Sequence, residues 1–76
     1  MKYGPTPENM ELIRAKAGEK ANGVYRFRGV VYRVRDKRVT HIAHNGKVLE
    51  RYGHFDVEVG VYDGCEAAAA NMLRSI

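Results

Sequence analysis

Apolar and polar residues alternate along the chain from residue 24 to residue 61, and the alternation changes phase at a few points. A single strand cannot change phase, because its side chains point to opposite faces with a period of two. A two-residue hairpin turn produces the change, since residues directly opposite each other on paired strands share a face. Such a turn at Arg28-Gly29 would place Phe27 against Val30.

Three further two-residue turns explain the remaining phase changes. Asn45-Gly46 is the strongest of them, because a type I′ turn needs positive φ at both central residues. Asp36-Lys37 is a weaker turn signal since neither residue is glycine, and Gly53-His54 fits a type II′ turn. The sequence therefore predicts an antiparallel meander of four to five strands, over about 24–27, 30–35, 38–44, 47–52 and 55–61.

In this register the meander has one apolar face and one basic face. The apolar face contains two polar residues, His41 and Glu50, which lie directly opposite each other. The remainder of that face is Tyr25, Phe27, Val30, Tyr32, Val34, Val39, Ala43, Val48, Tyr52, Phe55, Val57, Val59 and Val61. The basic residues of the other face are Arg26, Arg28, Arg33, Arg35, Lys47 and Arg51.

A helix is predicted on each side of the meander. Thr6-Pro7-Glu8 combines a hydroxyl N-cap, a proline at the first helical position and an acid in the first turn, which predicts a helix over 7–17. Asp63 and Glu66 have the spacing of a capping box and predict a second helix from about 64 to the last residues. Both helices are too short to be stable alone. We therefore expect an α+β fold with both helices packed on the apolar face.

The length of the chain, 76 residues, is that of one domain, 1–76. Residues 1–5 are expected to be flexible, as termini usually are. A single cysteine excludes an internal disulfide and is typical of a reducing compartment. There is no apolar run long enough to span a membrane and no apolar stretch of a secretory signal at the N-terminus. We therefore expect a cytoplasmic monomer with no membrane partner.

The net charge of +4 is concentrated in the meander. Between residues 24 and 52 there are eight Lys or Arg residues and two acids. Arginine matches phosphate and carboxylate groups, so the basic face predicts binding to nucleic acid or to an acidic protein surface. Lys2 and Tyr3 are further candidates for partner binding, because tyrosine is enriched at interfaces. The alternative is that the charges only keep this face soluble.

The residues that could support catalysis or metal binding form no recognisable pattern. His41 and His44 are three positions apart on one strand and point to opposite faces, so no metal site and no cofactor is expected. His41 opposite Glu50 is interpreted as a hydrogen-bonded pair, with a catalytic dyad as the alternative. Cys65 has no identifiable base or oxyanion site and is interpreted as a small buried residue. We expect no enzymatic activity.

The size, the lone cysteine, the Met1-Lys2-Tyr3 start and the Arg-rich hairpins over 24–35 and 38–51 resemble small phage antitermination proteins that bind host RNA polymerase. The resemblance implies a non-enzymatic, phage-encoded regulator that acts on the transcription machinery in the host cytoplasm. Proteins of that type contact both polymerase and nucleic acid. The alternatives are a free-standing DNA- or RNA-binding domain, similar to the arm-type modules of phage integrases, and an anti-CRISPR inhibitor.

Overall fold

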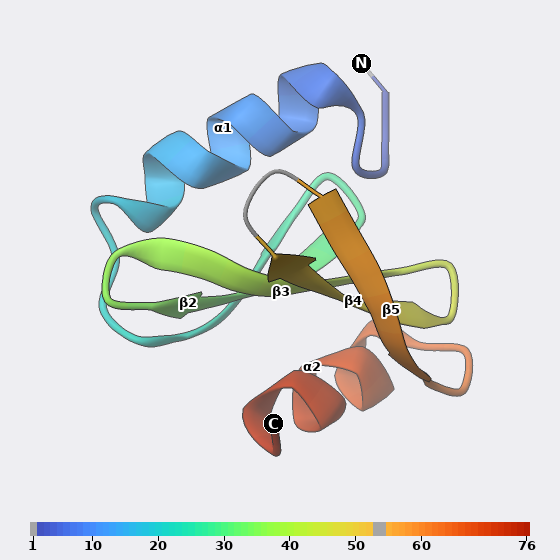
Figure 1. Ribbon diagram of the computed structural model, residues 1–76. Coiled ribbons are helices and arrows are strands. Elements are labelled where there is room, and N and C mark those ends of the chain that lie inside the picture. The colour runs from blue at the N-terminus through green and yellow to red at the C-terminus, as the bar shows by residue number, and fades with distance from the viewer. Residues whose placement is uncertain (1, 53–54) are drawn as a thin grey trace.

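The computed structural model describes residues 2–52 and 55–76. Its five strands form one antiparallel sheet in the order β1-β2-β3-β4-β5, with a helix at each end of the chain (Figure 1). The predicted α+β fold and the predicted meander are confirmed. The elements are α1 (Pro7–Ala17), β1 (Gly23–Phe27), β2 (Val30–Arg35), β3 (Arg38–His44), β4 (Lys47–Tyr52), β5 (Phe55–Val61) and α2 (Glu66–Arg74).

The first three hairpin turns are two-residue turns of one kind. Both residues have positive φ in Arg28-Gly29, in Asp36-Lys37 and in Asn45-Gly46, as a type I′ turn requires. The sequence therefore predicted these turns at the correct residues, including the pair that lacks glycine. The fourth predicted turn, Gly53-His54, lies outside the described residues.

A register shift between β2 and β3 changes the faces of the sheet. Val34 lies opposite Val39, whereas Arg33 lies opposite His41, so Thr40 is an extra residue in β3. Such a bulge moves every side chain beyond it to the other face, relative to a regular ladder. The sequence predicted that His41 and Val34 share a face. The bulge instead places them on opposite faces of the sheet.

A second register shift lies between β4 and β5. Val48 pairs with Gly60, whereas Leu49 pairs with Glu58, so Val59 is the extra residue. The two shifts together make the predicted division into one apolar and one basic face wrong.

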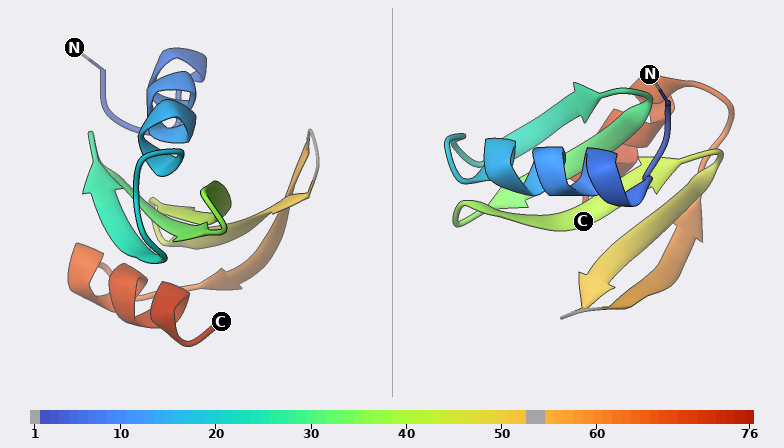
Figure 2. Two further views of the ribbon diagram at one scale, coloured as in Figure 1. Left: turned by 90° about the vertical axis from the view of Figure 1, so that its left-hand side faces the viewer. Right: turned by 90° about the horizontal axis from the view of Figure 1, so that it is seen from above.

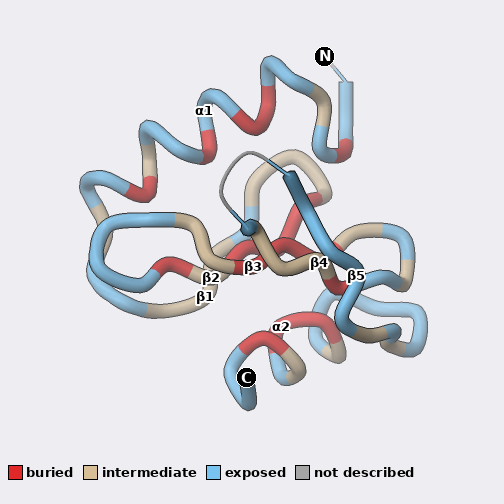
Figure 3. Tube along the Cα trace, in the orientation of Figure 1, coloured by how far each residue is buried: buried red, intermediate tan, exposed pale blue. Residues whose placement is uncertain are grey.

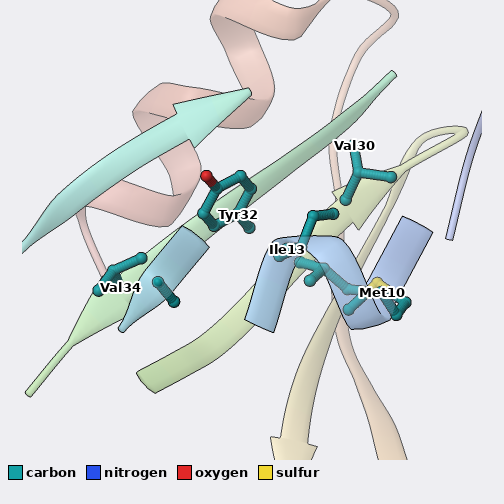
Figure 4. Packing of buried hydrophobic residues seen from close by; sticks show 7 residues of the cluster. Met10, Ile13, Val30, Tyr32 and Val34 are labelled. Carbon is teal, nitrogen blue, oxygen red and sulfur yellow. The ribbon is translucent and has the colours of Figure 1, made fainter. Parts of the chain in front are cut away.

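The two helices cover opposite faces of the sheet (Figures 1 and 2). On one face, α1 contributes Met10, Ile13 and Ala17 to a core with Val30, Tyr32, Val34 and Ile42, and Figure 4 shows this packing from close by. On the other face, α2 contributes Ala69, Ala70 and Leu73 to a core with Val31, Ala43 and Val48.

The prediction that both helices share one face is therefore wrong. The physical reason lies in the central strands, which carry apolar side chains on both faces. Val30, Val31 and Tyr32 are consecutive in β2 and are all buried. Alternation then gives each face an apolar surface that requires a cover.

Strand β5 lies largely outside the core (Figure 3). Val57 and Val59, which were predicted to be core residues, are 43% and 48% exposed. β5 forms an edge of the sheet. Neither helix makes more than a few contacts with it, because both pack mainly on β1, β2 and β3.

The helix starts agree with the sequence only at α1. There Thr6 is the N-cap, its hydroxyl accepts a hydrogen bond from the Asn9 amide at 3.2 Å, and Pro7 opens the helix. The N-cap of α2 is Cys65, not Asp63, and its side chain makes no capping hydrogen bond. Since the helix begins later than predicted, Cys65 precedes the stripe that packs on the sheet and is exposed.

The buried side chain of Asn9 attaches the N-terminal segment to the sheet. Its Nδ2 donates to the carbonyl oxygens of Lys2, at 2.8 Å, and Gly4, at 2.9 Å. Its Oδ1 accepts from Arg28 Nη1 at 2.9 Å. Lys2 and Gly4 are thus joined to α1 by hydrogen bonds. The flexibility expected of residues 1–5 stays a prediction.

Candidate anion-binding cleft

Strands β3 and β4 diverge at one end of the sheet. Their pairing ends at His41 and Glu50, although β3 begins at Arg38 and β4 continues to Tyr52. The hairpins β2–β3 and β4–β5 therefore separate, as the right-hand view of Figure 2 shows. A cleft of about 690 Å³ lies at this end and is lined, among others, by Arg33, Arg35, Arg38, His41, Glu50, Arg51 and Tyr52.

Three arginines of the β2–β3 hairpin line this cleft. Arg35 and Arg38 flank the turn and lie directly opposite each other, and both are exposed. Arg33 shares a face with Arg35, because it lies two positions before it on the same strand. Within residues 2–52 and 55–76, none of the three forms an ion pair with a carboxylate. Like charges directly opposite each other destabilise a sheet, so this arrangement has a cost for the free protein.

At the base of the cleft, Arg33 contacts a buried histidine. Arg33 Nη1 lies 3.3 Å from His41 Nδ1, and His41 is 7% exposed. Burial and the charge of Arg33 lower the pKa of His41 below its usual value, although Glu50 acts in the opposite direction. Burial likewise lowers the pKa of Arg33, and the neighbouring Arg35 lowers it further. The lowered pKa favours the neutral form of His41 beside the cationic Arg33.

The predicted opposition of His41 and Glu50 is confirmed by the register. Their predicted hydrogen bond is not found between these described side chains. His41 Nδ1 instead lies within hydrogen-bond distance of Arg33 and of Thr40 Oγ1, the latter at 3.1 Å. This pair therefore has no geometry of a catalytic dyad.

The six basic residues that were predicted to share one face lie in three places. Arg26, Arg33 and Arg35 are on the face that α2 covers, as alternation from Val31 requires. Lys47 and Arg51 alternate with Val48 and so lie on the α1 face. Arg28 is in the β1–β2 turn, at the other end of β2 from the cleft.

Four of those six residues already have anionic partners within the described part of the chain. The pairs, in each case between side-chain atoms, are Arg26 with Glu66 at 3.3 Å, Arg28 with Glu8 at 3.6 Å, Lys47 with Glu58 at 3.8 Å and Arg51 with Asp56 at 3.3 Å. Their charge is largely balanced within the molecule, so they add less to the attraction of a partner than Arg33 and Arg35 do.

Lys2 and Tyr3 lie far along the chain from the cleft arginines, beside the β1–β2 turn. Gly4 N donates to Arg28 O at 2.8 Å, which places this segment at that end of β2. Tyr3 is 69% exposed and Lys2 is exposed. These two residues therefore share no site with Arg35 and Arg38.

Sequence reasoning missed two residues of the cleft, Arg38 and Tyr52, and one of a neighbouring hollow, Arg74. Arg38 had a signal, because a two-residue turn at Asp36-Lys37 places it opposite Arg35. Arg74 lines a hollow of about 180 Å³ together with Arg33 and Arg35, and no sequence signal places α2 on that face. Tyr52 was assigned to the core but is 62% exposed.

Comparison of the chain with protein-family models, with curated proteins and with solved structures finds no match. Among the described residues, no three His, Cys, Asp or Glu side chains are grouped so that they could hold a metal ion. Neither helix is long and apolar enough to cross a membrane. What the chain does must therefore be inferred from its own side chains.

Proposed function

We propose that this chain is a small, non-enzymatic regulatory protein that docks on the transcription machinery, with RNA polymerase as its partner. The contact is made by the cleft between β3 and β4, which receives an anionic group of the partner. The observation that carries this proposal is the Arg35–Arg38 pair, two exposed guanidinium groups opposite each other with no carboxylate partner among the described residues.

The chemistry of the cleft supports an anionic partner. Arginine presents a planar fork of donors that binds carboxylate or phosphate in a bidentate manner. A partner anion between Arg35 and Arg38 would remove the repulsion between them and gain hydrogen bonds from both. Tyrosine and arginine are also the residues that contribute most to binding energy at interfaces, and Tyr52 stands at the same cleft.

The choice of RNA polymerase rests on the resemblance to phage regulators in size and in the Arg-rich hairpins. An acidic surface of that enzyme would meet the arginines of the β2–β3 hairpin. Electrostatic attraction of this kind speeds association and weakens as salt rises.

Single-stranded nucleic acid is the second candidate, and one observation favours it. The rings of Tyr52 and Phe55 stack with centroids 6.1 Å apart and are 62% and 55% exposed. Exposed aromatic rings beside arginines are typical of proteins that bind single strands, because bases stack on the rings.

Biolayer interferometry with purified bacterial RNA polymerase and with single-stranded RNA and DNA tests the proposal. The double variant R35A/R38A should bind polymerase about tenfold or more weakly than the wild type. The control R14A/K47A removes the same charge from outside the cleft and should bind within about threefold of the wild type. Equal polymerase binding by wild type and R35A/R38A would overturn the proposal. Tight binding of nucleic acid without polymerase binding would favour the second candidate.

A further inference from the structure

A second hollow, of about 270 Å³, lies beside the cleft and shares His41 and Glu50 with it. Its remaining lining comes from β4, β5 and the C-terminal end of α2, and most of it is apolar. These residues are Val48, Val59, Gly60, Met72, Ser75 and Ile76. Val48 is fully buried, whereas Val59 and Ile76 are 48% and 47% exposed. The hollow thus has an apolar floor and a rim that solvent reaches.

The bulge in β5 shapes this hollow. Val59 is the extra residue there, and Gly60 follows it opposite Val48. A side chain at position 60 would begin 3.2 Å from the Met72 methyl group. The absence of a side chain on Gly60 therefore lets Met72 approach the strand and leaves space beside it. The volume is below the roughly 300–1,000 Å³ of small-molecule sites, so the hollow suits a single apolar side chain.

Apolar side chains continue from the hollow along β5 and the end of β4. Val57 pairs with Glu50 and so lies on the same face as the hollow. Val57 is 43% exposed, and Tyr52 and Phe55 are more exposed still. Contiguous exposed apolar surface of this kind marks an interaction site more often than single exposed residues do. The apolar surface and the arginine-lined cleft meet at His41 and Glu50.

We propose that the two hollows together bind one acidic peptide segment of the partner protein. One apolar side chain of that segment enters the smaller hollow, and its carboxylates lie against Arg33, Arg35 and Arg38. This inference rests on the proposed function and names the chemistry of the partner. The positive charge of the cleft favours the acidic side chains of the segment. The apolar floor formed by Val48 and Met72 favours its apolar side chain, which serves as the anchor.

Glu50 favours a peptide over nucleic acid in this place. Glu50 lines both hollows, and its negative charge would repel a phosphate that passes between them. Nucleic acid carries a phosphate at every nucleotide, whereas a peptide can place its acids on one side of the anchor only. The smaller hollow is also lined by Val, Met and Ile side chains, which offer no aromatic ring for a base to stack on.

Fluorescence anisotropy with labelled synthetic peptides tests this inference on the full chain. The first peptide contains a run of Asp and Glu followed by one Phe, the second has Ala in place of Phe, and the third has Gln and Asn in place of the acids. A single-stranded oligothymidylate of similar length is the fourth ligand. We expect the first peptide to bind about tenfold or more tightly than each of the others.

Protein variants assign each part of the peptide to its hollow. Val59→Gln should weaken the binding of the first peptide about tenfold and leave the binding of the Ala peptide unchanged. Val61→Gln is the matched control, because Val61 is 67% exposed on the same strand and lines neither hollow. R35A/R38A should weaken the binding of the first peptide and of the Ala peptide to the same extent. An NMR measurement on the wild type alone gives a test that needs no variant. The Met72 methyl resonance should shift when the first peptide is added and should not shift when the Ala peptide is added.

The outcomes separate this inference from the proposed function. If the Phe and Ala peptides bind equally and Val59→Gln binds as the wild type does, the inference is wrong. Tighter binding of oligothymidylate than of the first peptide also overturns it. In either case a loss of polymerase binding by R35A/R38A would leave the proposed function standing. If R35A/R38A binds polymerase as the wild type does, the proposed function fails, whichever peptide binds.

Discussion

Arg33 Nη1 donates a hydrogen bond to His41 Nδ1 across the β2–β3 ladder, with 3.3 Å between the two nitrogens. The direction of this bond follows from chemistry, because a guanidinium group has donors and no acceptor. His41 Nδ1 must therefore be unprotonated. A proton on this nitrogen would break the bond and place a second positive charge against Arg33.

This relationship predicts that the protein loses stability in mild acid. The pKa of His41 is lowered in the folded state by burial and by Arg33, whereas in the unfolded state it stays near the usual value of about 6.5. Below about pH 6.5 the unfolded state therefore binds more protons, and the free energy of unfolding falls as the pH falls towards the folded-state pKa. Urea titrations of the wild type and of His41→Gln at pH 7 and pH 5 measure this effect. An equal loss of stability in both proteins would show that His41 is not its source.

Replacing Arg38 by Glu should stabilise the free protein and weaken partner binding. The change turns a like-charge pair with Arg35 into an opposite-charge pair, which is worth about 0.2–1 kcal/mol on a sheet. Arg38→Gln removes only the repulsion and should give an intermediate gain. Denaturant unfolding measures the stability, and interferometry with polymerase measures the binding. A loss of stability in Arg38→Glu would contradict the assignment of Arg38 opposite Arg35.

Truncation of Val48 and of Val57 should have different effects. Val48 is fully buried beneath α2, whereas Val57 is 43% exposed. Val48→Ala should lower the free energy of unfolding by about 1–3 kcal/mol, through lost burial and a cavity. Val57→Ala should cost less than about 1 kcal/mol. Chemical denaturation of the two variants measures the difference, and equal losses would place Val57 in the core instead.

Asn9 should be among the polar residues whose loss is most costly. It is 1% exposed and joins α1, the N-terminal segment and the β1–β2 turn by three hydrogen bonds. Asn9→Ala would leave buried groups without partners, at a cost of about 1–3 kcal/mol. Asn71→Ala is the control, because Asn71 is exposed and bonds only Arg74 among the described side chains, and it should change the stability by no more than about 0.5 kcal/mol. Thermal unfolding measures the stability of both variants. Similar losses of stability in the two would show that Asn9 has no special structural role.

The sequence predicted those parts of the fold and the site that depend on near neighbours. A type I′ turn is determined by two residues and by the phase of the strands beside it, so the turns at Arg28-Gly29 and Asn45-Gly46 were found. The hydroxyl cap at Thr6 was found for the same reason. Arg33 and Arg35 were also recognised as candidates, since they alternate with apolar residues in β2.

The two bulges could not be predicted, and the largest errors follow from them. Thr40 and Val59 are ordinary strand residues, and nothing local distinguishes an extra residue in one strand from a regular pair. Each shift exchanges the faces beyond it, so the β2–β3 shift separated Lys47 and Arg51 from Arg33 and Arg35. Val57 pairs with Glu50 as predicted, and it is exposed because both helices pack mainly on β1, β2 and β3.

By itself, the sequence determined five strands, the three turn positions that the structure describes and two helices, because hydrophobic period and turn chemistry act over a few residues. Tertiary packing alone decided which face each helix covers, since β2 is apolar on both sides and accepts a helix on either. It also decided the cleft, which exists because β3 and β4 stop pairing beyond His41 and Glu50. Burial of two apolar faces determined the positions of α1 and α2, and those positions left Arg35 and Arg38 of the β2–β3 hairpin exposed at the cleft.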